Sequence, residues 1–350
     1  MIATSLVALA LSSVVAAGPI LSLSLAGPAN HFGAGSIVVS ATLTNTGDET
    51  ATLLNDPNTV LSTSETNTFA ISTVDGKTPT FLGKFVKWTP STAEKTVLAP
   101  GESVTISHKI GNAYDFTHTG AGLYSIETSS KLTLVTENGF EEIHADTTAL
   151  ETKLTGALIK PELKTAVENA RSRAISRRSL DKRISYDSCS SSRQSQIATA
   201  ASSALTYATN AAAYLTNHTT TSTRYTTWFG TFTSSRRSTV LSHYNNLKSH
   251  SWSSNTYSCD CTESAYAYTY SYATGEMWLC SAFWSAPTTG TDSKAGTIVH
   301  ESTHWDAIAG TDDYAYGQTA AKSLAKSSPS TAIFNADSHE YFAENTPSLS

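Results

Sequence analysis

The chain has 350 residues and a formal net charge of −6. This length predicts two or three domains, each large enough to bury its own core. The negative charge argues against nucleic acid as a partner, because phosphate binding requires an excess of Lys and Arg. Charged residues make up only 15% of the chain, which is common in secreted proteins.

Residues 1–17 are predicted to be a signal peptide. The stretch from Ile2 to Ala17 is apolar apart from a few Ser and Thr residues, and it is too short to cross a bilayer as a helix. It ends in small residues that fit a signal peptidase site, although no Lys or Arg precedes the apolar run. No other apolar stretch approaches the ~20 residues of a membrane helix. We therefore expect a secreted, extracellular product without a membrane anchor.

From residue 18 to about residue 150 the sequence is typical of an all-β domain. Short runs rich in β-forming residues alternate with Gly, Pro, Asn and Asp turns. These runs are 36–44, 81–88, 103–108 and 122–128. They predict an antiparallel β-sandwich of immunoglobulin-like size.

The stretch from Thr152 to Arg183 is expected to be helical, and it is rich in Lys and Arg. It could be no more than a solvated linker helix. However, Lys182-Arg183 directly before Ile184 also fits a dibasic processing site on a flexible linker. We therefore expect residues 18–183 to be a pro-region, with the sandwich as a pro-domain that assists folding, inhibits, or does both. Residues 184–350 would then be the catalytic domain.

All four cysteines lie after this processing site. An even number in an oxidising compartment predicts two disulfides, with three possible connectivities. A metal site is less favoured, because a single residue separates Cys259 from Cys261 and zinc ligands are usually spaced further apart. A bond between those two cysteines would be strained. The other two are Cys189 and Cys280.

The C-terminal part is predicted to be mainly helical with some strands. An Ala-rich stripe indicates a long helix with one buried face. Asn217, at its end, is a potential N-glycan acceptor. Strand-like segments from 257 to 284 are expected to supply the edge on which an extended peptide lies. The predicted helices are 191–215, 235–248, 295–309 (ended by Gly310), 314–326 and 330–345.

One stretch of the helix at 295–309 indicates a metal site. His300 and His304 are four residues apart, so both imidazoles lie on one face, with Glu301 beside them. Such a pair suits zinc, and a hydrolytic zinc site needs a third protein ligand plus a water. A helix whose histidines merely pack or face water is the alternative. Downstream carboxylates that could be the third ligand are Asp312, Asp313, Asp337, Glu340 and Glu344.

The segment GTDDYAYG, residues 310–317, resembles the GTxDxxYG motif of the aspzincins, the deuterolysin-like fungal metalloendopeptidases. The resemblance implies that Asp313 is the third zinc ligand and that the Tyr316 hydroxyl holds the developing oxyanion. From about Tyr186 onward, the segments RYTTWFGTF, LCSAFWSAPTTGTDSKAGTIVHESTHW and NADSHEYFAEN resemble the peptidyl-lysine metalloendopeptidases of mushroom-forming fungi. That likeness implies disulfides joining Cys189 to Cys259 and Cys261 to Cys280.

The resulting expectation is a zymogen of a secreted zinc endopeptidase, with a β-sandwich pro-domain and a mainly helical α+β zincin-like catalytic domain. Zinc would be held by His300, His304 and Asp313, with Glu301 as general base. We expect a monomer that acts on protein and peptide substrates.

The bond cut is expected to be the one on the amino side of lysine. Asp337 and Glu340 lie one helical turn apart, and their counterparts in the lysine-specific subgroup line the pocket for the residue after the scissile bond. Otherwise this pair would be a solvated acidic face. Two alternatives stay open: a broad-specificity deuterolysin-type endopeptidase, and a non-catalytic secreted binding protein with a vestigial zinc site. The presence of Glu301 counts against the second, because a structural zinc site needs no base.

Overall fold

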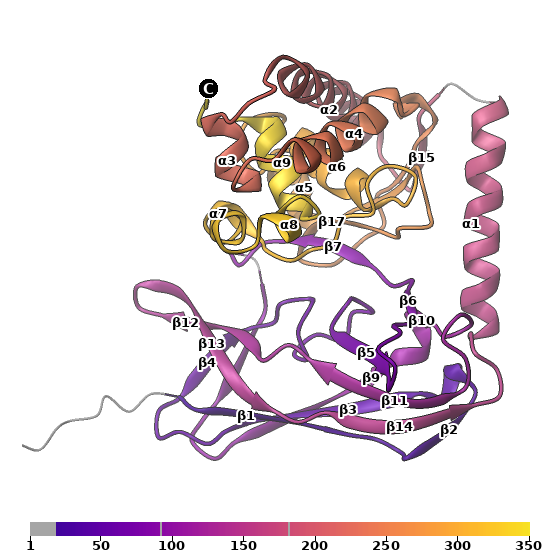
Figure 1. Ribbon diagram of the computed structural model, residues 1–350, viewed down its shortest axis with the longest axis vertical. Coiled ribbons are helices and arrows are strands. Elements are labelled where there is room, and N and C mark those ends of the chain that lie inside the picture. Colours follow the sequence, from indigo (N-terminus) through magenta and orange to yellow (C-terminus); the bar gives the residue numbers. More distant parts are fainter. Residues whose placement is uncertain (1–18, 92, 181–182) are drawn as a thin grey trace, which may run out of the picture.

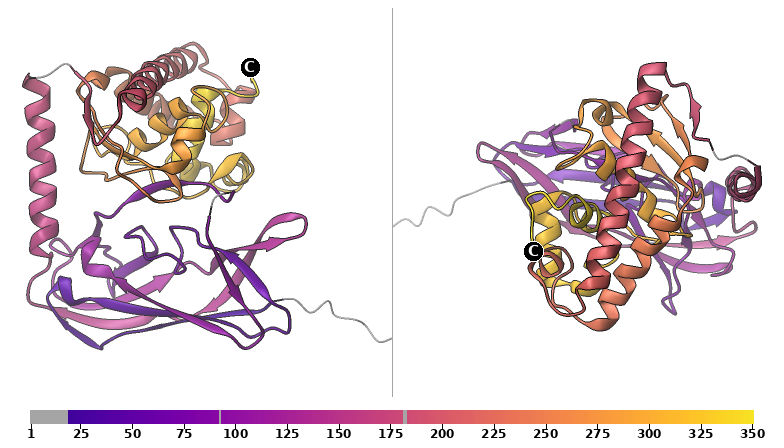
Figure 2. Two further views of the ribbon diagram at one scale, coloured as in Figure 1. Left: turned by 180° about the vertical axis from the view of Figure 1, so that it is seen from behind. Right: turned by 90° about the horizontal axis from the view of Figure 1, so that it is seen from above.

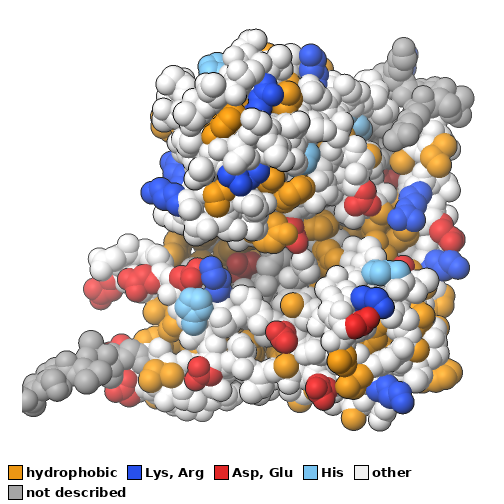
Figure 3. Space-filling view, in the orientation of Figure 1, with side chains coloured by type: hydrophobic (Ala, Val, Ile, Leu, Met, Phe, Trp, Pro, Cys, Tyr) orange, Lys and Arg blue, Asp and Glu red, His pale blue; other side chains and the backbone are white. Residues whose placement is uncertain are grey.

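The computed structural model describes residues 19–91, 93–180 and 183–350, so the expected signal peptide and Lys182 lie outside the described residues. An all-β N-terminal part and a mainly helical C-terminal part lie one above the other (Figure 1). Helix α1 (Pro161–Leu180) runs along one side and connects them. Charged side chains are dispersed over the face seen in Figure 3.

The N-terminal part is a sandwich of two sheets around one apolar core. One sheet has the order β8-β4-β12-β13-β1-β3-β9 and the other β2-β14-β11-β5. Alternate residues of β3 point inward, as expected for a strand with one buried face. Most neighbours are antiparallel, as predicted, but β1–β13 and β2–β14 are parallel. The strands are β1 (Leu21–Ala26), β2 (Asn30–Phe32), β3 (Val38–Asn45), β4 (Ala51–Leu54), β5 (Phe69–Thr73), β8 (Lys95–Leu98), β9 (Ser103–Lys109), β11 (Gly122–Thr128), β12 (Lys131–Thr136), β13 (Gly139–Thr147) and β14 (Leu150–Thr155), with a separate pair β6 (Thr80–Phe81) and β10 (Tyr114–Asp115).

The connecting helix begins later than predicted. Residues 150–155 form the last sandwich strand, and α1 starts at Pro161, whose fixed φ and missing N–H suit the first turn of a helix. One face of α1 buries Leu163 and Val167 against Tyr272 of the C-terminal part. Arg173 forms a bidentate ion pair with Glu276, at 2.6 and 3.0 Å. These contacts fasten the helix to the C-terminal part.

The C-terminal part is built on α2 (Ser191–Asn217), which Ser190 caps by accepting a hydrogen bond from the Arg193 N–H. Small Ala side chains on its buried face allow α4 and α6 to pack closely against it. Two disulfides join Cys189 to Cys259 and Cys261 to Cys280, the pairing that the resemblance implied. The remaining helices are α3 (Thr223–Phe229), α4 (Ser234–Ser249), α5 (Ser281–Ser285), α6 (Lys294–His304), α7 (Gly317–Ser327), α8 (Pro329–Ala332) and α9 (Ala336–Glu344).

Several element boundaries differ from the prediction. Residues 281–285 are helical rather than strand-like, and α6 ends at His304 instead of reaching Gly310. The helix stops there because Trp305 is buried with its indole N–H donating to Thr269 Oγ1 at 2.8 Å. The final predicted helix is two helices, divided at Asn335, whose side-chain oxygen accepts from the backbone N–H groups of Tyr314 and Ala315. This amide therefore fixes the loop before α7.

A strand of the N-terminal part belongs to the sheet of the C-terminal part. The order is β15-β16-β18-β17-β7, with β15 (Ser185–Asp187), β16 (Thr256–Ser258), β17 (Ala265–Thr269) and β18 (Glu276–Leu279). Strand β7 (Phe85–Trp88) leaves the sandwich and pairs antiparallel with β17. Figures 1 and 2 show it lying against the helical layer, between the two parts. The edge predicted to bind an extended peptide is thus covered by the chain itself.

Candidate metal centre and the acidic pocket beside it

Helix α6 places two imidazoles in the interior. Ser293 caps it by accepting from the Gly296 N–H at 2.9 Å, and every residue of the helix is buried. The His304 Nδ1 atom lies 2.8 Å from the Thr311 carbonyl oxygen, so Nδ1 carries the proton and Nε2 offers its lone pair. His300 Nδ1 lies 2.8 Å from Asp337 Oδ1, which leaves its Nε2 facing the same point. Both rings are therefore oriented as metal ligands usually are.

Asp313 completes this arrangement. Its Oδ1 atom lies 3.2 Å from His300 Nε2 and 3.5 Å from His304 Nε2. All three side chains are buried, yet neither Nε2 atom nor either Asp313 oxygen makes a hydrogen bond within the described residues. Buried polar atoms normally have partners, so converging donor atoms without them fit a metal ion. Two imidazoles and one carboxylate are a ligand set typical of hydrolytic zinc.

A second group of converging ligand atoms, from His300, Asp337 and Glu340, lies next to the first. This one holds an ammonium group, because Lys87 Nζ lies 2.6 Å from Glu340 Oε2 and 3.7 Å from Asp337 Oδ1. Burial opposes the charge of Lys87, but the neighbouring carboxylates outweigh it and hold the pKa of this lysine well above its usual range. The group therefore binds an ammonium and is not a second metal centre. We call it the acidic pocket.

Glu301 lies beside the metal centre and is fully buried. Its Oε1 atom accepts a hydrogen bond from the backbone N–H of Lys87 at 3.1 Å, while Oε2 has no hydrogen-bond partner among the described residues. Burial raises the pKa of Glu301 to about 8. Because Oε2 has no partner among the described residues, this carboxylate can accept a proton and later return it.

Tyr316 directs its hydroxyl toward the same place. The hydroxyl donates to the backbone oxygen of Val86 at 3.0 Å and accepts from the Asn58 amide at 2.6 Å. Burial, together with the charge of Asp313, raises the pKa of Tyr316 well above its usual range. The hydroxyl therefore keeps its proton and can act as a donor. Tyr314, by contrast, is half exposed.

The acidic pocket contains the two predicted carboxylates and one that sequence reasoning missed. Asp337 and Glu340 are buried on α9, so they are not a solvated face. Asp292 lies 3.5 Å from the Lys87 ammonium, and its Oδ1 atom accepts from the Tyr341 hydroxyl at 2.7 Å. The only signal for Asp292 in the sequence was its place just before the Ser293 cap of the active-site helix.

Glu344 supports this pocket from behind. Its Oε1 atom accepts from the N–H and the hydroxyl of Ser293, at 2.9 and 2.8 Å, and its Oε2 atom accepts from the Asp292 N–H. Burial and the nearby Glu340 raise the pKa of Glu344 to about 9. It was considered above as a zinc ligand, but its oxygens instead fix the start of α6.

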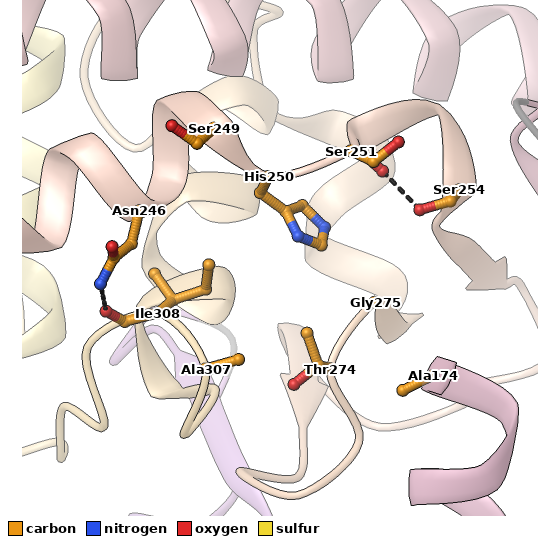
Figure 4. Close-up of a pocket in the computed structure, with 10 residues that line it drawn as sticks. All are labelled: Ala174, Asn246, Ser249, His250, Ser251, Ser254, Thr274, Gly275, Ala307 and Ile308. Atoms are coloured by element: carbon orange, nitrogen blue, oxygen red, sulfur yellow. Dashed lines mark hydrogen bonds between the residues drawn. The ribbon is translucent and has the colours of Figure 1, made fainter. Parts of the chain in front are cut away.

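A cavity of about 410 Å³ lies away from these residues, where α1 meets the C-terminal part. Figure 4 shows His250 and Thr274 at its walls, with Ala174 of α1 closing one side. None of the residues that line it belongs to the metal centre or to the acidic pocket. The candidate site is thus distinct from this cavity. Strand β7 crosses the candidate site, not the cavity.

Two imidazoles on one face of a helix, with a carboxylate converging on them and a glutamate buried beside them, are typical of zinc metallopeptidases. Residues 214–344 match the Aspzincin M35 family, described as lysine-specific metallo-endopeptidase. The chain is 49% identical over 358 residues to the peptidyl-Lys metalloendopeptidase of Armillaria mellea, covering 99% of this chain and 97% of that one. It is 46% identical over 350 residues to the enzyme of the same name from Grifola frondosa, covering 97% of each.

A solved structure, described as a zinc peptidase from Grifola frondosa, is 55% identical and covers 46% of this chain and 100% of that chain, with a TM-score of 0.46. From the family match and the full-length relatives together, this chain belongs to the aspzincin metalloendopeptidases. It is a zinc-dependent endopeptidase, as the sequence predicted.

Proposed function

We propose that this chain is the precursor of a secreted zinc endopeptidase that cuts peptide bonds on the amino side of lysine. The observation that carries the proposal is the buried ammonium of Lys87 among Asp337, Glu340 and Asp292, directly beside the metal centre. Removing an ammonium from water is costly unless opposite charge surrounds it. The pocket supplies that charge for a substrate lysine. Arginine would fit poorly, because its planar guanidinium demands a different geometry.

The residues around the metal centre support a hydrolytic mechanism. His300, His304 and Asp313 would hold the zinc ion, which would supply a Lewis acid and lower the pKa of an attacking water. Glu301 takes a proton from that water and delivers it to the departing lysine nitrogen. The Tyr316 hydroxyl donates to the scissile carbonyl oxygen as negative charge develops on it, a type of contact that typically contributes ~2.7–4 kcal/mol to the transition state.

Residues 18–183 act in this proposal as a pro-region that is removed after Arg183. Two observations support it: β7 of the sandwich crosses the candidate site, and Arg183 is exposed between α1 and β15. Secretion is supported by the two disulfides, which persist in oxidising compartments. Within the described residues, the helices are all too short or too polar to cross a membrane. The processed enzyme is proposed to be a monomer.

The test is to digest a mixture of denatured proteins with the processed enzyme and to identify the new N-termini by mass spectrometry. We expect lysine at nearly all of them, few arginines, and no products after a chelator removes the metal. New N-termini spread over many residue types would favour the broad-specificity alternative and leave the zinc mechanism standing. No products from a zinc-replete sample would instead favour a binding protein with a vestigial site.

A further inference from the structure

Strand β7 lies in the candidate site as an extended peptide would. Phe85, Val86 and Lys87 pair antiparallel with Thr269, Tyr268 and Ala267 of β17. Adding a strand to a sheet edge is a general mode of peptide binding, in which backbone hydrogen bonds give affinity and side-chain pockets give specificity. The stacking of the Phe85 ring on the His304 imidazole, with centroids 4.4 Å apart, holds this segment against the metal centre.

The side chain that enters the acidic pocket is a lysine. Lys87 is only 2% exposed, and its ammonium contacts the three carboxylates described above. The rings of Tyr266 and Tyr341 lie 5.1 and 5.7 Å from the same ammonium and add cation–π contacts. A sandwich residue without such a role would keep its ammonium in water, as nearly all lysines do.

The peptide bond before this lysine is contacted on both sides by the residues assigned to catalysis. The Val86 carbonyl oxygen accepts from the Tyr316 hydroxyl at 3.0 Å, and the Lys87 N–H donates to Glu301 Oε1 at 3.1 Å. These are the carbonyl to be attacked and the nitrogen to be protonated in a cut on the amino side of lysine. The register of β7 therefore matches that of a substrate to be cut, and not only that of a segment that blocks the site.

Other contacts between the two parts fix this register. The Asn58 amide donates to the Tyr316 hydroxyl at 2.6 Å, and the Asn67 amide donates to Asp312 Oδ2 at 2.9 Å. Both asparagines belong to the sandwich segment between β4 and β5. Lys84 adds an ion pair with Glu263 at 2.7 Å just before β7. The β7 segment is thus held just before its first residue and in the pocket, and it presents one bond to the metal centre.

We propose that the Val86–Lys87 bond is an internal cleavage site, which blocks the active site while intact and is hydrolysed there by the same chain. This inference rests on the lysine preference of the proposed function. In the reaction the oxygen of one water joins the Val86 carbonyl carbon and the carbon–nitrogen bond breaks. Glu301 carries a water proton to the Lys87 nitrogen. The products are a carboxylate at Val86 and an amine at Lys87.

The cut does not by itself separate the pieces of the sandwich. Strands β4 and β3 precede the bond, whereas β8 and β9, which pair with them, follow it. The two fragments are therefore held together by shared sheets and by one apolar core. The cut frees the ends of β7, so that the segment can leave the pocket while the sandwich stays assembled.

The experiment uses the full chain with Lys182→Ala and Arg183→Ala, so that the pro-region stays attached. The zinc-loaded protein is followed over time by mass spectrometry under denaturing conditions. We expect one internal cut, with a new N-terminus at Lys87, at a rate unchanged by tenfold dilution. Adding Glu301→Gln should keep the chain intact.

Two variants test whether the cut depends on the lysine in the acidic pocket or on the loss of any lysine from the N-terminal part. Lys87→Gln should slow the cut by at least ~100-fold, because the pocket carboxylates lose their cation. Lys77→Gln removes an exposed lysine of the N-terminal part that pairs with Asp75, outside the pocket, and should leave the cut in place. Thermal denaturation of both variants checks that they fold.

The outcomes separate the two proposals. A precursor that stays intact, or is cut at another lysine or only at high concentration, overturns the internal site, provided that the processed enzyme cuts denatured proteins before lysine. A processed enzyme without lysine preference overturns the proposed function instead.

Discussion

His300 Nδ1 lies 2.8 Å from Asp337 Oδ1, so the acidic pocket and the metal centre share one contact. The same oxygen is 3.7 Å from the Lys87 ammonium. Asp337 therefore faces a ligand ring and a bound cation at once, and its other oxygen accepts from the Gly317 N–H at 2.5 Å. Glu340 Oε2 is closer to the ammonium, at 2.6 Å, and farther from His300 Nδ1, at 3.4 Å.

This asymmetry predicts different effects for Asp337→Asn and Glu340→Gln. Partners of metal-binding histidines typically contribute 10–100-fold to metal affinity, so we expect Asp337→Asn to weaken zinc binding by about that factor and also to reduce lysine preference. Glu340→Gln should reduce lysine preference with a smaller change in zinc affinity. Chelator competition measures the affinity, and the cleavage profile on denatured protein measures the preference. Equal zinc affinities of the two variants would contradict the assigned contact.

Asp313→Ala should lower zinc occupancy, because it removes one of three converging ligands. Elemental analysis of the purified protein measures this directly. Glu301→Gln is the matched control: it should keep zinc and the fold but lower turnover by at least ~10²-fold. Full occupancy in Asp313→Ala would mean that another carboxylate is the third ligand.

Removal of the proposed pro-region after Arg183 can be tested separately. Active secreted enzyme should begin at Ile184 or within a few residues of it, and changing Lys182 and Arg183 to Ala should give a larger form that retains residues of the pro-region. N-terminal sequencing and mass measurement of the secreted protein distinguish the two. An N-terminus near Gly18 on fully active protein would refute removal of the pro-region.

Gly296 is required by the close approach of α9 to α6. A Cβ atom at this position would lie 2.1 Å from Glu344 Oε1 and 2.8 Å from Glu340 Oε1. We expect Gly296→Ala to lower the free energy of unfolding by roughly 1–3 kcal/mol, as overpacking does, and to weaken lysine preference because both carboxylates must move. Gly122→Ala, where nothing lies within 4 Å of the added Cβ, is the control for denaturant unfolding. A similar loss in both variants would contradict the steric explanation.

A buried histidine pair predicts that the protein loses stability in mild acid. His339 Nδ1 contacts the Asn335 carbonyl oxygen at 2.9 Å, and His243 Nδ1 contacts His339 Nε2 at 3.0 Å, so both rings are held neutral. Burial lowers the pKa of His243 to about 4, and burial with the adjacent His243 lowers the pKa of His339 to about 3. Because the unfolded chain binds these protons first, stability should fall as the pH drops from 6.5 toward 4.

The expected loss is roughly 2–3 kcal/mol for each histidine over this range. Melting temperatures at pH 7 and pH 4.5, in a Glu301→Gln background that prevents self-digestion, measure it. His243→Gln should reduce the pH dependence, whereas His218→Gln, at an exposed position, should not. An unchanged pH dependence in His243→Gln would contradict the prediction.

Local sequence signals were enough for much of the C-terminal part. The Ala-rich stripe of α2 gave the long helix because its period is intrinsic to the segment. The spacing of His300 and His304 placed both rings on one face, and the structure brings Asp313 to them. Helix boundaries were less predictable, because Trp305 follows the end of α6 and Asn335 precedes the start of α9, and both make contacts with residues that are distant in sequence or lie across a loop.

The arrangement of the two parts could not be predicted from local patterns. The segment FVKW has the features of a sandwich strand, and nothing in it indicates a partner 180 residues away in β17. Lys87 and Glu340, 253 residues apart, meet only because the two parts, each with its own apolar core, lie against each other. Asp292 was missed for the same reason, since its role is apparent only when an ammonium lies beside it.

Strand β7 also covers an edge of the sheet in the C-terminal part. Once β7 leaves, β17 becomes an outer strand with unpaired N–H and C=O groups, and such a strand can pair with the same strand of another molecule. While the two parts remain docked, β7 covers those groups. For as long as β7 stays in place, it therefore blocks edge-to-edge pairing of β17 between molecules.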